Sequence, residues 1–147
     1  KVKDAAFSTD IIVGFPNETD EQFQDTLKLV DHCKFDNSFT FIYSPRTGTP
    51  AARMKDEVSM EDKHIRFNKL VDIINKRGLE RNLAYEGKVL KVLVEGTSKR
   101  NKEILSGYSE ENKLVNFKGS VDSIGKIVKV KITKAKTYTL EGEEVHE

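Results

Sequence analysis

The pattern of secondary-structure signals changes at Tyr85, and this change implies a fold made of two different parts. Before Tyr85, two short apolar β-type runs, residues 11–13 and 39–43, each end in a Gly/Pro loop and are separated by a segment with helical periodicity. After it, residues 88–145 contain five short β-type runs separated by Gly, Asn or Ser turns. We therefore predict an α/β part followed by a small all-β part.

The first part is predicted to form a βαβ unit. Residues 11–13 are β-branched throughout, which is typical of a strand covered on both faces, as in a parallel sheet. Thr19 and Gln22 form a capping-box signature, and a helix is expected from about Asp20 to Cys33. A strand, a helix and a second strand at this spacing favour a right-handed crossover between parallel strands.

A long helix is predicted next, from Met60 to about Ala84. Gly78 lies inside it and costs about 1 kcal/mol relative to alanine, so we expect a kink or break there. The single cysteine, Cys33, is expected to be a small buried apolar side chain. One cysteine cannot form an internal disulfide or hold a metal or an iron–sulfur cluster by itself.

The second part is predicted to form a small closed or partly closed antiparallel barrel. Its strands are expected at residues 88–94, 105–108, 114–117, 127–133 and 138–145. In the fourth run, apolar residues alternate with Lys129, Lys131 and Thr133, which predicts one apolar and one cationic face. The alternation is interrupted near residues 134–136, and this predicts a β-bulge.

The charge of the chain is distributed unevenly, although the formal net charge is only +1. Residues 1–84 carry 13 Lys and Arg against 14 Asp and Glu, whereas residues 85–136 carry 12 against 6. The net charge of the whole chain therefore predicts neither a nucleic-acid nor a membrane partner, but the β part has the basic character of an RNA-binding surface. The alternative is that these lysines only solubilise an antiparallel sheet, which is the commoner role of any single lysine.

The candidate RNA-binding side chains are cations, one amide and one aromatic ring. Cations follow phosphates, an amide reads base or sugar edges, and a ring stacks on a base. The ring is that of Phe117, which is predicted to be exposed, with a position in the core as the alternative. The candidates are Arg46, Lys99, Arg100, Lys113, Asn116, Phe117, Lys118, Lys129 and Lys131.

The two Gly/Pro loops, residues 14–18 and 44–50, follow the carboxyl ends of the first two predicted strands. Loops at that edge of a parallel sheet often border a ligand. The first loop also precedes a helix N-terminus, whose free amides suit an anion or a carboxylate. The alternative is that the loops only shape turns. The sequence has no nucleophile–base pattern, no C-x-x-C and no Gly-rich phosphate loop, so it shows no complete active site.

Several motifs together resemble the C-terminal part of the radical-SAM tRNA methylthiotransferases, and in particular the MiaB-type members. These enzymes convert isopentenyladenosine beside the tRNA anticodon to its 2-methylthio form. The resemblance covers essentially the whole chain. Its motifs are residues 10–16 (DIIVGFP) followed by Glu18 and Thr19, residues 39–51, residues 92–96 (VLVEG) and residues 112–119 (NKLVNFKG).

The resemblance implies an α/β remnant of a radical-SAM partial TIM barrel (βαβ plus long helix), followed by a small all-β, OB-like five-stranded TRAM barrel. The corresponding domains are residues 1–58, the connecting helix 59–84 and the TRAM domain 85–147. The TRAM domain would bind the tRNA anticodon stem-loop. The residues implied to border S-adenosylmethionine are Val13, Gly14, Phe15, Pro16, Tyr43 and Ser44. The chain departs from the family at Asn17, where a glycine is usual, and at Thr47, where a proline is usual.

Enzymes of this family hold two [4Fe–4S] clusters through six cysteines, and Cys33 matches none of them. The resemblance therefore implies a missing N-terminal part of the same enzyme as a partner, no catalytic residue or metal ligand in this chain, and no turnover by the chain alone. The alternatives are a stand-alone RNA-binding module and a part of the related methylthiotransferase that modifies a ribosomal protein. Because there is no apolar stretch near 20 residues and no signal-peptide pattern, we expect a cytoplasmic protein without a membrane partner.

Overall fold

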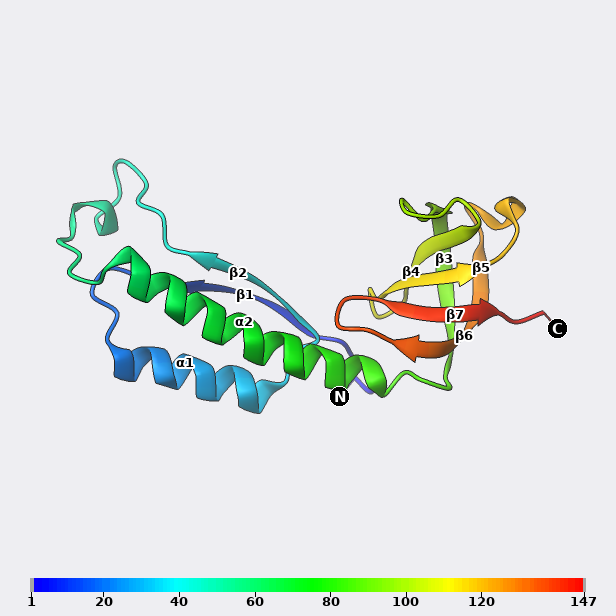
Figure 1. Ribbon diagram of the computed structural model, residues 1–147, viewed down its shortest axis with the longest axis horizontal. Helices are drawn as coiled ribbons and strands as arrows, with labels where there is room; N and C mark the ends of the chain where they lie inside the picture. Colours follow the sequence, from blue (N-terminus) through cyan, green and yellow to red (C-terminus); the bar gives the residue numbers. More distant parts are fainter. Residues whose placement is uncertain (1, 147) are drawn as a thin grey trace. The chain divides into compact units, whose positions relative to one another are not determined.

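The computed structural model describes residues 2–146, which fall into two compact units. One unit comprises Phe7–Arg77, and the other joins the residues up to Ala6 to those from Gly78 onward. The elements, labelled in Figure 1, are β1 (Ser8–Val13), α1 (Asp20–Cys33), β2 (Asn37–Ile42), η1 (Ala51–Arg53), α2 (Met60–Leu83), β3 (Val89–Thr97), β4 (Ile104–Ser109), β5 (Leu114–Lys118), η2 (Val121–Ser123), β6 (Ile127–Ala135) and β7 (Leu140–Glu144).

The first unit is built on two parallel strands and two helices. β1 pairs with β2 along its whole length, from Ser8 opposite Asn37 to Val13 opposite Ile42. The side chain of Thr19 accepts a hydrogen bond from the backbone of Gln22 and the reciprocal bond is also present, so the predicted capping box is confirmed. One core joins β1 to both helices, and its buried residues are Val13, Phe23, Val30, Leu70 and Ile74.

The other face of this two-stranded sheet is open. Ile12 is 58% exposed, and Phe39 and Phe41 on the neighbouring strand are 56% and 54% exposed. The expectation that residues 11–13 are covered on both faces is therefore wrong for this chain. The physical reason is that successive strand residues point to opposite faces, and the helices cover only the face that carries Val13.

Two smaller expectations about the helices are also wrong. α2 continues through Gly78 as one helix, so the break considered there does not occur, although Gly78 is where the second compact unit begins. The hydrogen bonding of a long helix outweighs the propensity cost of about 1 kcal/mol of one glycine. Cys33 is exposed, because α1 ends there and the buried residues of this helix are Phe23 and Val30.

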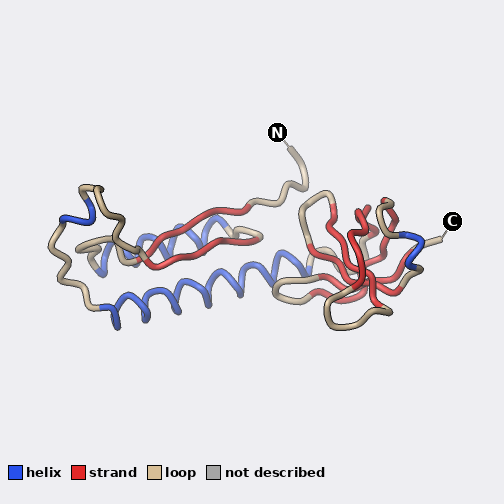
Figure 2. Tube along the Cα trace, turned by 90° about the horizontal axis from the view of Figure 1, so that it is seen from above, coloured by secondary structure: helices blue, strands red, loops and turns tan. Residues whose placement is uncertain are grey.

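The second unit contains a closed five-stranded barrel with the strand order β3-β4-β5-β7-β6 (Figure 2). Closure was predicted, but the purely antiparallel arrangement was not correct, because β7 inserts between β5 and β6 and runs parallel to β5. The predicted bulge in β6 lies slightly earlier, between Ile132 and Lys134. A second irregularity occurs in β3 between Val94 and Gly96.

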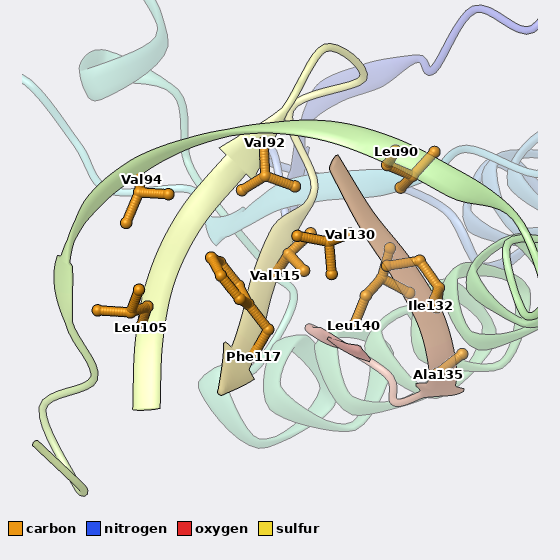
Figure 3. Close-up of a cluster of buried hydrophobic side chains, with 10 residues drawn as sticks. All are labelled: Leu90, Val92, Val94, Leu105, Val115, Phe117, Val130, Ile132, Ala135 and Leu140. Carbon is orange, nitrogen blue, oxygen red and sulfur yellow. The ribbon is translucent and has the colours of Figure 1, made fainter. Parts of the chain in front are cut away.

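The barrel encloses a core of buried side chains contributed by all five strands (Figure 3). Gly107 of β4 allows the closest strand approach, since a Cβ at this position would collide with the backbone carbonyl of Leu93 on β3. The core residues are Leu90, Val92, Val94, Leu105, Val115, Phe117, Val130, Ile132, Ala135 and Leu140.

The last turn of α2 is fastened to the barrel by hydrogen bonds. The side-chain amide of Asn82, which is buried, donates to the backbone carbonyls of Lys136 at 2.8 Å and Thr137 at 3.2 Å. Just beyond the helix, the backbone N–H of Gly87 donates to the carbonyl of Ile132 at 2.8 Å. The end of the helix is therefore a structural part of the barrel unit.

Candidate nucleic-acid interface and strand-end rim

The loops after β1 and β2 lie at the same edge of the first unit, as the parallel pairing requires. The backbone N–H of Tyr43 donates to the carbonyl of Val13 at 2.8 Å. The rings of Phe15 and Tyr43 meet edge to face, with their centroids 5.4 Å apart. The structure thus brings together the residues predicted at this rim: Phe15 and Ser44 are exposed, Tyr43 is half-buried, and Val13, Gly14 and Pro16 are buried.

The hydroxyl of Tyr43 is the polar atom of the rim that best fits a ligand. It is buried and has no hydrogen-bond partner among the residues that the structure describes. A buried phenolic hydroxyl normally has a partner, since an unsatisfied one costs free energy. The rim therefore offers a ring, Phe15, and an unsatisfied hydroxyl to a ligand with both apolar and polar groups.

An ion pair behind the rim holds the loop 14–18 in place. The guanidinium of Arg66 donates to the carbonyl of Glu18 at 2.7 Å and to its carboxylate at 3.2 Å. The same carboxylate accepts the backbone N–H of Gly14 at 3.2 Å. Because Glu18 and Arg66 are mostly buried, this pair fixes the loop. Sequence reasoning missed Arg66, since 48 positions separate it from Glu18 and no local pattern joins them.

Asn17, one of the two departures from the family pattern, connects this loop to residues 55–57. Its backbone is left-handed with φ 62°, a conformation that asparagine tolerates better than most residues other than glycine. Its amide donates to the carbonyl of Lys55 at 2.7 Å and accepts the N–H of Glu57 at 3.0 Å. The substitution therefore adds a cross-link while keeping the backbone conformation that glycine would allow.

A second ion pair, between Lys63 and Asp56, supports the same cross-link. The Lys63 ammonium donates to the Asp56 carboxylate and, together with the backbone N–H of Val58, holds the pKa of Asp56 below its usual value. The other oxygen of Asp56 lies 3.3 Å from the N–H of Asn17. The stem of Lys63 lies against Gly14, where a Cβ would come within 2.8 Å of it.

The N-terminus of α1 is poorly suited to the anion that the sequence suggested. Two of its amides are already used, since Thr19 and Gln22 bond each other reciprocally. The first turn also carries Asp20 and Glu21, whose carboxylates repel an anion. Arg46 is exposed in the loop after β2, and its carbonyl accepts the hydroxyl of Thr49 at 2.8 Å, which stabilises a turn there.

The barrel unit places most of the predicted RNA-binding residues on its outside. Lys129 and Lys131 alternate with buried residues of β6, as predicted, and Lys118 is exposed on β5. Asn116 is half-buried at an outward position of β5. Lys99 and Arg100 are exposed in the β3–β4 loop, which a hydrogen bond from Ser98 N–H to the Ile104 carbonyl closes at 2.6 Å.

Two of the predicted RNA-binding residues are not on the surface. Phe117 is 1% exposed inside the barrel core, so its ring cannot stack on a base (Figure 3). The alternation of Val115 and Phe117 with Asn116 and Lys118 was the signal for this inward position. Lys113 is 9% exposed, and its ammonium lies 5.7 Å from the centre of the Tyr85 ring, which favours an internal cation–π contact.

The position of β7 changes the charge of the outer surface. Glu143 lies opposite Lys118 on β5 and opposite Lys131 on β6, and Glu141 forms an ion pair with Lys136. These carboxylates partly neutralise the cations that flank β7. Lys91 of β3, which the sequence did not single out, lies opposite Lys129 and is exposed.

Between residues 2 and 146, no group of three or more His, Cys, Asp or Glu side chains is placed to hold a metal ion. In that same range, no helix combines the length and the apolar character needed to cross a bilayer.

Comparison with known proteins shows that most of the second unit is similar to one domain family and that the whole chain is similar to part of longer proteins. Residues 83–145 match the TRAM domain family. The chain is 58% identical over 143 residues to tRNA-2-methylthio-N(6)-dimethylallyladenosine synthase of Bacillus subtilis (strain 168), covering 97% of this chain and 28% of that protein. It is 56% identical over 146 residues to the protein of the same name from Bacillus cereus (strain B4264), covering 99% and 29%. The chain thus spans less than a third of the length of these relatives.

Proposed function

We propose that this chain, which carries a TRAM domain and is homologous over nearly its whole length to part of the tRNA methylthiotransferases, is the C-terminal part of such an enzyme. The parent enzyme would add a 2-methylthio group to isopentenyladenosine beside the tRNA anticodon, in the cytoplasm. This chain would contribute the RNA-binding domain and part of the S-adenosylmethionine pocket. The identity of 55–58% to relatives named for tRNA favours tRNA over a ribosomal protein as the substrate.

The observation that carries the proposal is the basic outer surface of a closed barrel. Residues 85–136 have 12 Lys and Arg against 6 Asp and Glu, and the barrel directs most of these cations outward. The exposed loop residues Lys99 and Arg100 extend this surface. Cations arranged on one compact module supply the phosphate contacts on which RNA affinity depends.

The cofactor role rests on the rim of the first unit. S-adenosylmethionine, when bound, supplies the methyl group and the radical chemistry of these enzymes. Phe15 would pack on an apolar part of the cofactor, and the buried hydroxyl of Tyr43 would find its missing hydrogen-bond partner there. The ion pair of Glu18 and Arg66 would keep the loop in the conformation that binds.

The remaining part of the proposal is that a preceding segment of the same protein completes the active site. Ile12, Phe39 and Phe41 present a large apolar area on the open sheet face, which the rest of a barrel would cover. The relatives are more than three times as long as the matched region, so they have the residues for such a segment. The two iron–sulfur clusters would be held there, and the 147-residue chain alone would have no activity.

Titration of the chain with a fluorescently labelled anticodon stem-loop RNA at several salt concentrations tests the RNA-binding role. Phosphate contacts predict that log K falls linearly with log salt, by about 0.7 to 0.9 per phosphate contacted. A duplex of the same length without a loop is the control for recognition of the stem alone. Absence of binding at low salt, or an affinity that salt does not change, would refute the proposal.

A separate experiment tests the parent activity. The protein that includes the preceding segment, reconstituted with iron and sulfide and supplied with S-adenosylmethionine and a reductant, is expected to methylthiolate isopentenyladenosine-containing tRNA, whereas the 147-residue chain treated in the same way is expected to remain inactive. Modification of a ribosomal protein instead of tRNA would contradict the proposal. A cluster absorbance on the 147-residue chain would contradict the part that assigns both clusters to the preceding segment.

A further inference from the structure

The barrel has two ends, and α2 joins only one of them. β3 begins next to α2 and leads to the opposite end of the barrel, called here the free end (Figure 1). The strand directions place two connections at the free end, residues 98–103 between β3 and β4 and residues 119–126 between β5 and β6. Residues 84–88, 110–113 and 136–139 are the connections at the end next to α2.

The connections at the two ends differ in charge. Those at the free end contain four cations against two carboxylates: Lys99, Arg100, Lys102 and Lys126 against Glu103 and Asp122. Those next to α2 contain three cations against three carboxylates: Lys88, Lys113 and Lys136 against Glu86, Glu110 and Glu111. The free-end connections therefore carry a net positive charge, whereas the connections next to α2 are neutral. A polyanion is attracted to the free end.

The cations next to α2 are also occupied by internal contacts. The ammonium groups of Lys88 and Lys113 lie 5.4 Å and 5.7 Å from the centre of the Tyr85 ring. Lys136 forms an ion pair with Glu141 of β7. A ring face or a carboxylate beside a cation competes with an RNA phosphate for it. This end of the barrel therefore has little positive charge to offer to RNA.

The strand faces between the two ends are compensated as well. On the outer face of β3, Lys91 and Glu95 are both exposed, so that face carries no net charge. Lys129 of β6 makes an interaction of its own. The lysines that the strand register places opposite a glutamate of β7 are Lys118, Lys131 and Lys134. The strand faces are thus less attractive to a polyanion than their number of lysines suggests.

The 98–103 loop is different, because its cations have no such partners. Lys99, Arg100 and Lys102 are exposed, and among the residues that the structure describes none of them forms an ion pair with a carboxylate. Glu103, the carboxylate of the same loop, is exposed and pairs with none of the three. Three adjacent cations with solvated charges can each accept a phosphate as a partner.

Hydrogen bonds within the loop hold its backbone in one conformation. The N–H of Ser98 donates to the carbonyl of Ile104 at 2.6 Å, and the N–H of Ile104 donates to the carbonyl of Asn101 at 3.1 Å. The side-chain oxygen of Asn101 accepts the N–H of Glu103 at 2.9 Å. A loop that is ordered before binding loses less conformational entropy on meeting its ligand. The loop is therefore a preformed support for its three cations.

The free end lacks the groups that stack on bases. Neither residues 98–103 nor residues 119–126 include Phe, Tyr or Trp. The exposed rings of the barrel unit lie toward α2, since Tyr108 is the last residue but one of β4 and Tyr138 is in the 136–139 connection. Phosphate contacts position a nucleic acid but do not read its sequence, whereas base contacts do. The free end can therefore bind an RNA backbone without stacking on its bases.

We infer that the 98–103 loop binds the phosphate backbone of RNA through Lys99, Arg100 and Lys102, and that this contact supplies affinity without reading the base sequence. The inference rests on the proposed RNA-binding function. It moves the contact from the strand faces, where carboxylates offset the lysines, to one loop at the free end of the barrel. Recognition of the base sequence then belongs to another part of the protein.

Titration of the 147-residue chain with a fluorescently labelled anticodon stem-loop RNA at several salt concentrations tests the loop. The triple variant Lys99→Gln, Arg100→Gln, Lys102→Gln is expected to lower the slope of log K against log salt by about 2 to 3, and the affinity at low salt by at least about ten-fold. The matched control removes the same formal charge from lysines next to the β7 glutamates, through Lys131→Gln, Lys134→Gln and Lys136→Gln. Its affinity is expected to fall by less than about two-fold, and thermal unfolding of both variants verifies that the barrel is intact.

A second RNA tests whether bases are read. It has the same stem and the same number of phosphates, but every base of its loop is replaced. We expect the unaltered chain to bind both RNAs with affinities within about two-fold of each other, because the phosphates are unchanged. The charge-retaining variant Lys99→Arg, Arg100→Lys is expected to bind both RNAs as the unaltered chain does.

The outcomes separate this inference from the proposed function. If the unaltered chain binds RNA with a steep salt dependence but the loop variant binds equally well, the inference is wrong while RNA binding stands. Equal losses in the loop variant and its matched control would show that total charge matters and not the loop, and would also overturn the inference. A strong preference between the two RNAs would contradict binding without base reading. If the unaltered chain binds neither RNA, the proposed RNA-binding function itself is wrong.

Discussion

The two units of this chain differ in whether their sheet is closed. The barrel pairs every strand with two neighbours and surrounds its buried side chains completely. The two-stranded sheet of the first unit has one covered face and one open face, where Phe39 and Phe41 are more than half exposed. Closing a sheet into a barrel pairs its edge strands and buries its apolar side chains within one module. The apolar face of an open sheet is buried only when another segment covers it.

This difference separates the proposed roles of the two units. The barrel contains its whole core, so its outer surface is available for a partner such as RNA. The first unit presents one apolar sheet face and a strand-end rim with an unsatisfied buried hydroxyl, that of Tyr43. These features of the first unit are those expected of one part of a larger ligand-binding site.

The sharpest test of the comparison is to truncate a phenylalanine in each unit. Phe117→Ala removes a ring from the closed core and is expected to destabilise the barrel by about 3 to 5 kcal/mol. Phe39→Ala on the open face is expected to change stability by less than about 0.5 kcal/mol, since its ring is largely exposed. Urea unfolding followed by circular dichroism measures both changes. Equal effects of the two substitutions would contradict the distinction.

The next largest effect is expected where two barrel strands approach each other closely. A Cβ at Gly107 would overlap the backbone carbonyl of Leu93, which cannot move without shifting β3. We expect Gly107→Ala to destabilise the barrel by about 1 to 3 kcal/mol. Gly96→Ala is the control, because a Cβ there has no neighbour within 4 Å. Unfolding midpoints that fall equally for both variants would show that the close approach is not the cause.

A smaller effect is expected at the rim of the first unit. Gly14 has φ 74°, and a Cβ there would also press on the stem of Lys63 at 2.8 Å. Gly14→Ala is expected to cost about 1 to 2 kcal/mol for the backbone conformation alone, plus the displacement of Lys63. Gly48→Ala has a similar φ of 89° but open space around it, so it should show only the backbone cost. A larger loss for Gly48→Ala would invalidate this explanation.

The smallest effect is a pH dependence confined to the first unit. The Lys63 ammonium lowers the pKa of Asp56, so the stabilisation by this pair is fully present above the unfolded pKa of about 3.9 and disappears as the pH falls through the lower folded value. NMR titration of the Asp56 carboxylate should show a pKa below the usual one, and Lys63→Met should raise it toward the ordinary range, while the hydrogen bonds from the backbone N–H groups of Val58 and Asn17 keep part of the lowering. An unchanged pKa in this variant would exclude Lys63 as the cause.

Local sequence patterns were sufficient for the elements that local interactions determine. The capping box of Thr19 and Gln22 located the start of α1, and the alternation along β6 located the outward positions of Lys129 and Lys131. Both are decided by residues within a few positions of one another. The positive charge of the β part could also be predicted from the sequence, since it requires only a count of the charged residues.

The candidate sites were less predictable because distant residues build them. The ion pair between Glu18 and Arg66 and the cross-link from Asn17 to Lys55 join positions that no local pattern relates.

The sequence by itself determined that the chain has a βαβ part, a long helix and a basic five-stranded part, and its motifs resemble those of a known enzyme family. Only the tertiary structure decided that β7 lies between β5 and β6, which buries Phe117 inside a closed barrel and sets Glu143 beside Lys118 and Lys131. The physical reason is that strand order and register depend on contacts between residues far apart in the chain, while periodicity reports only which side chains share a face.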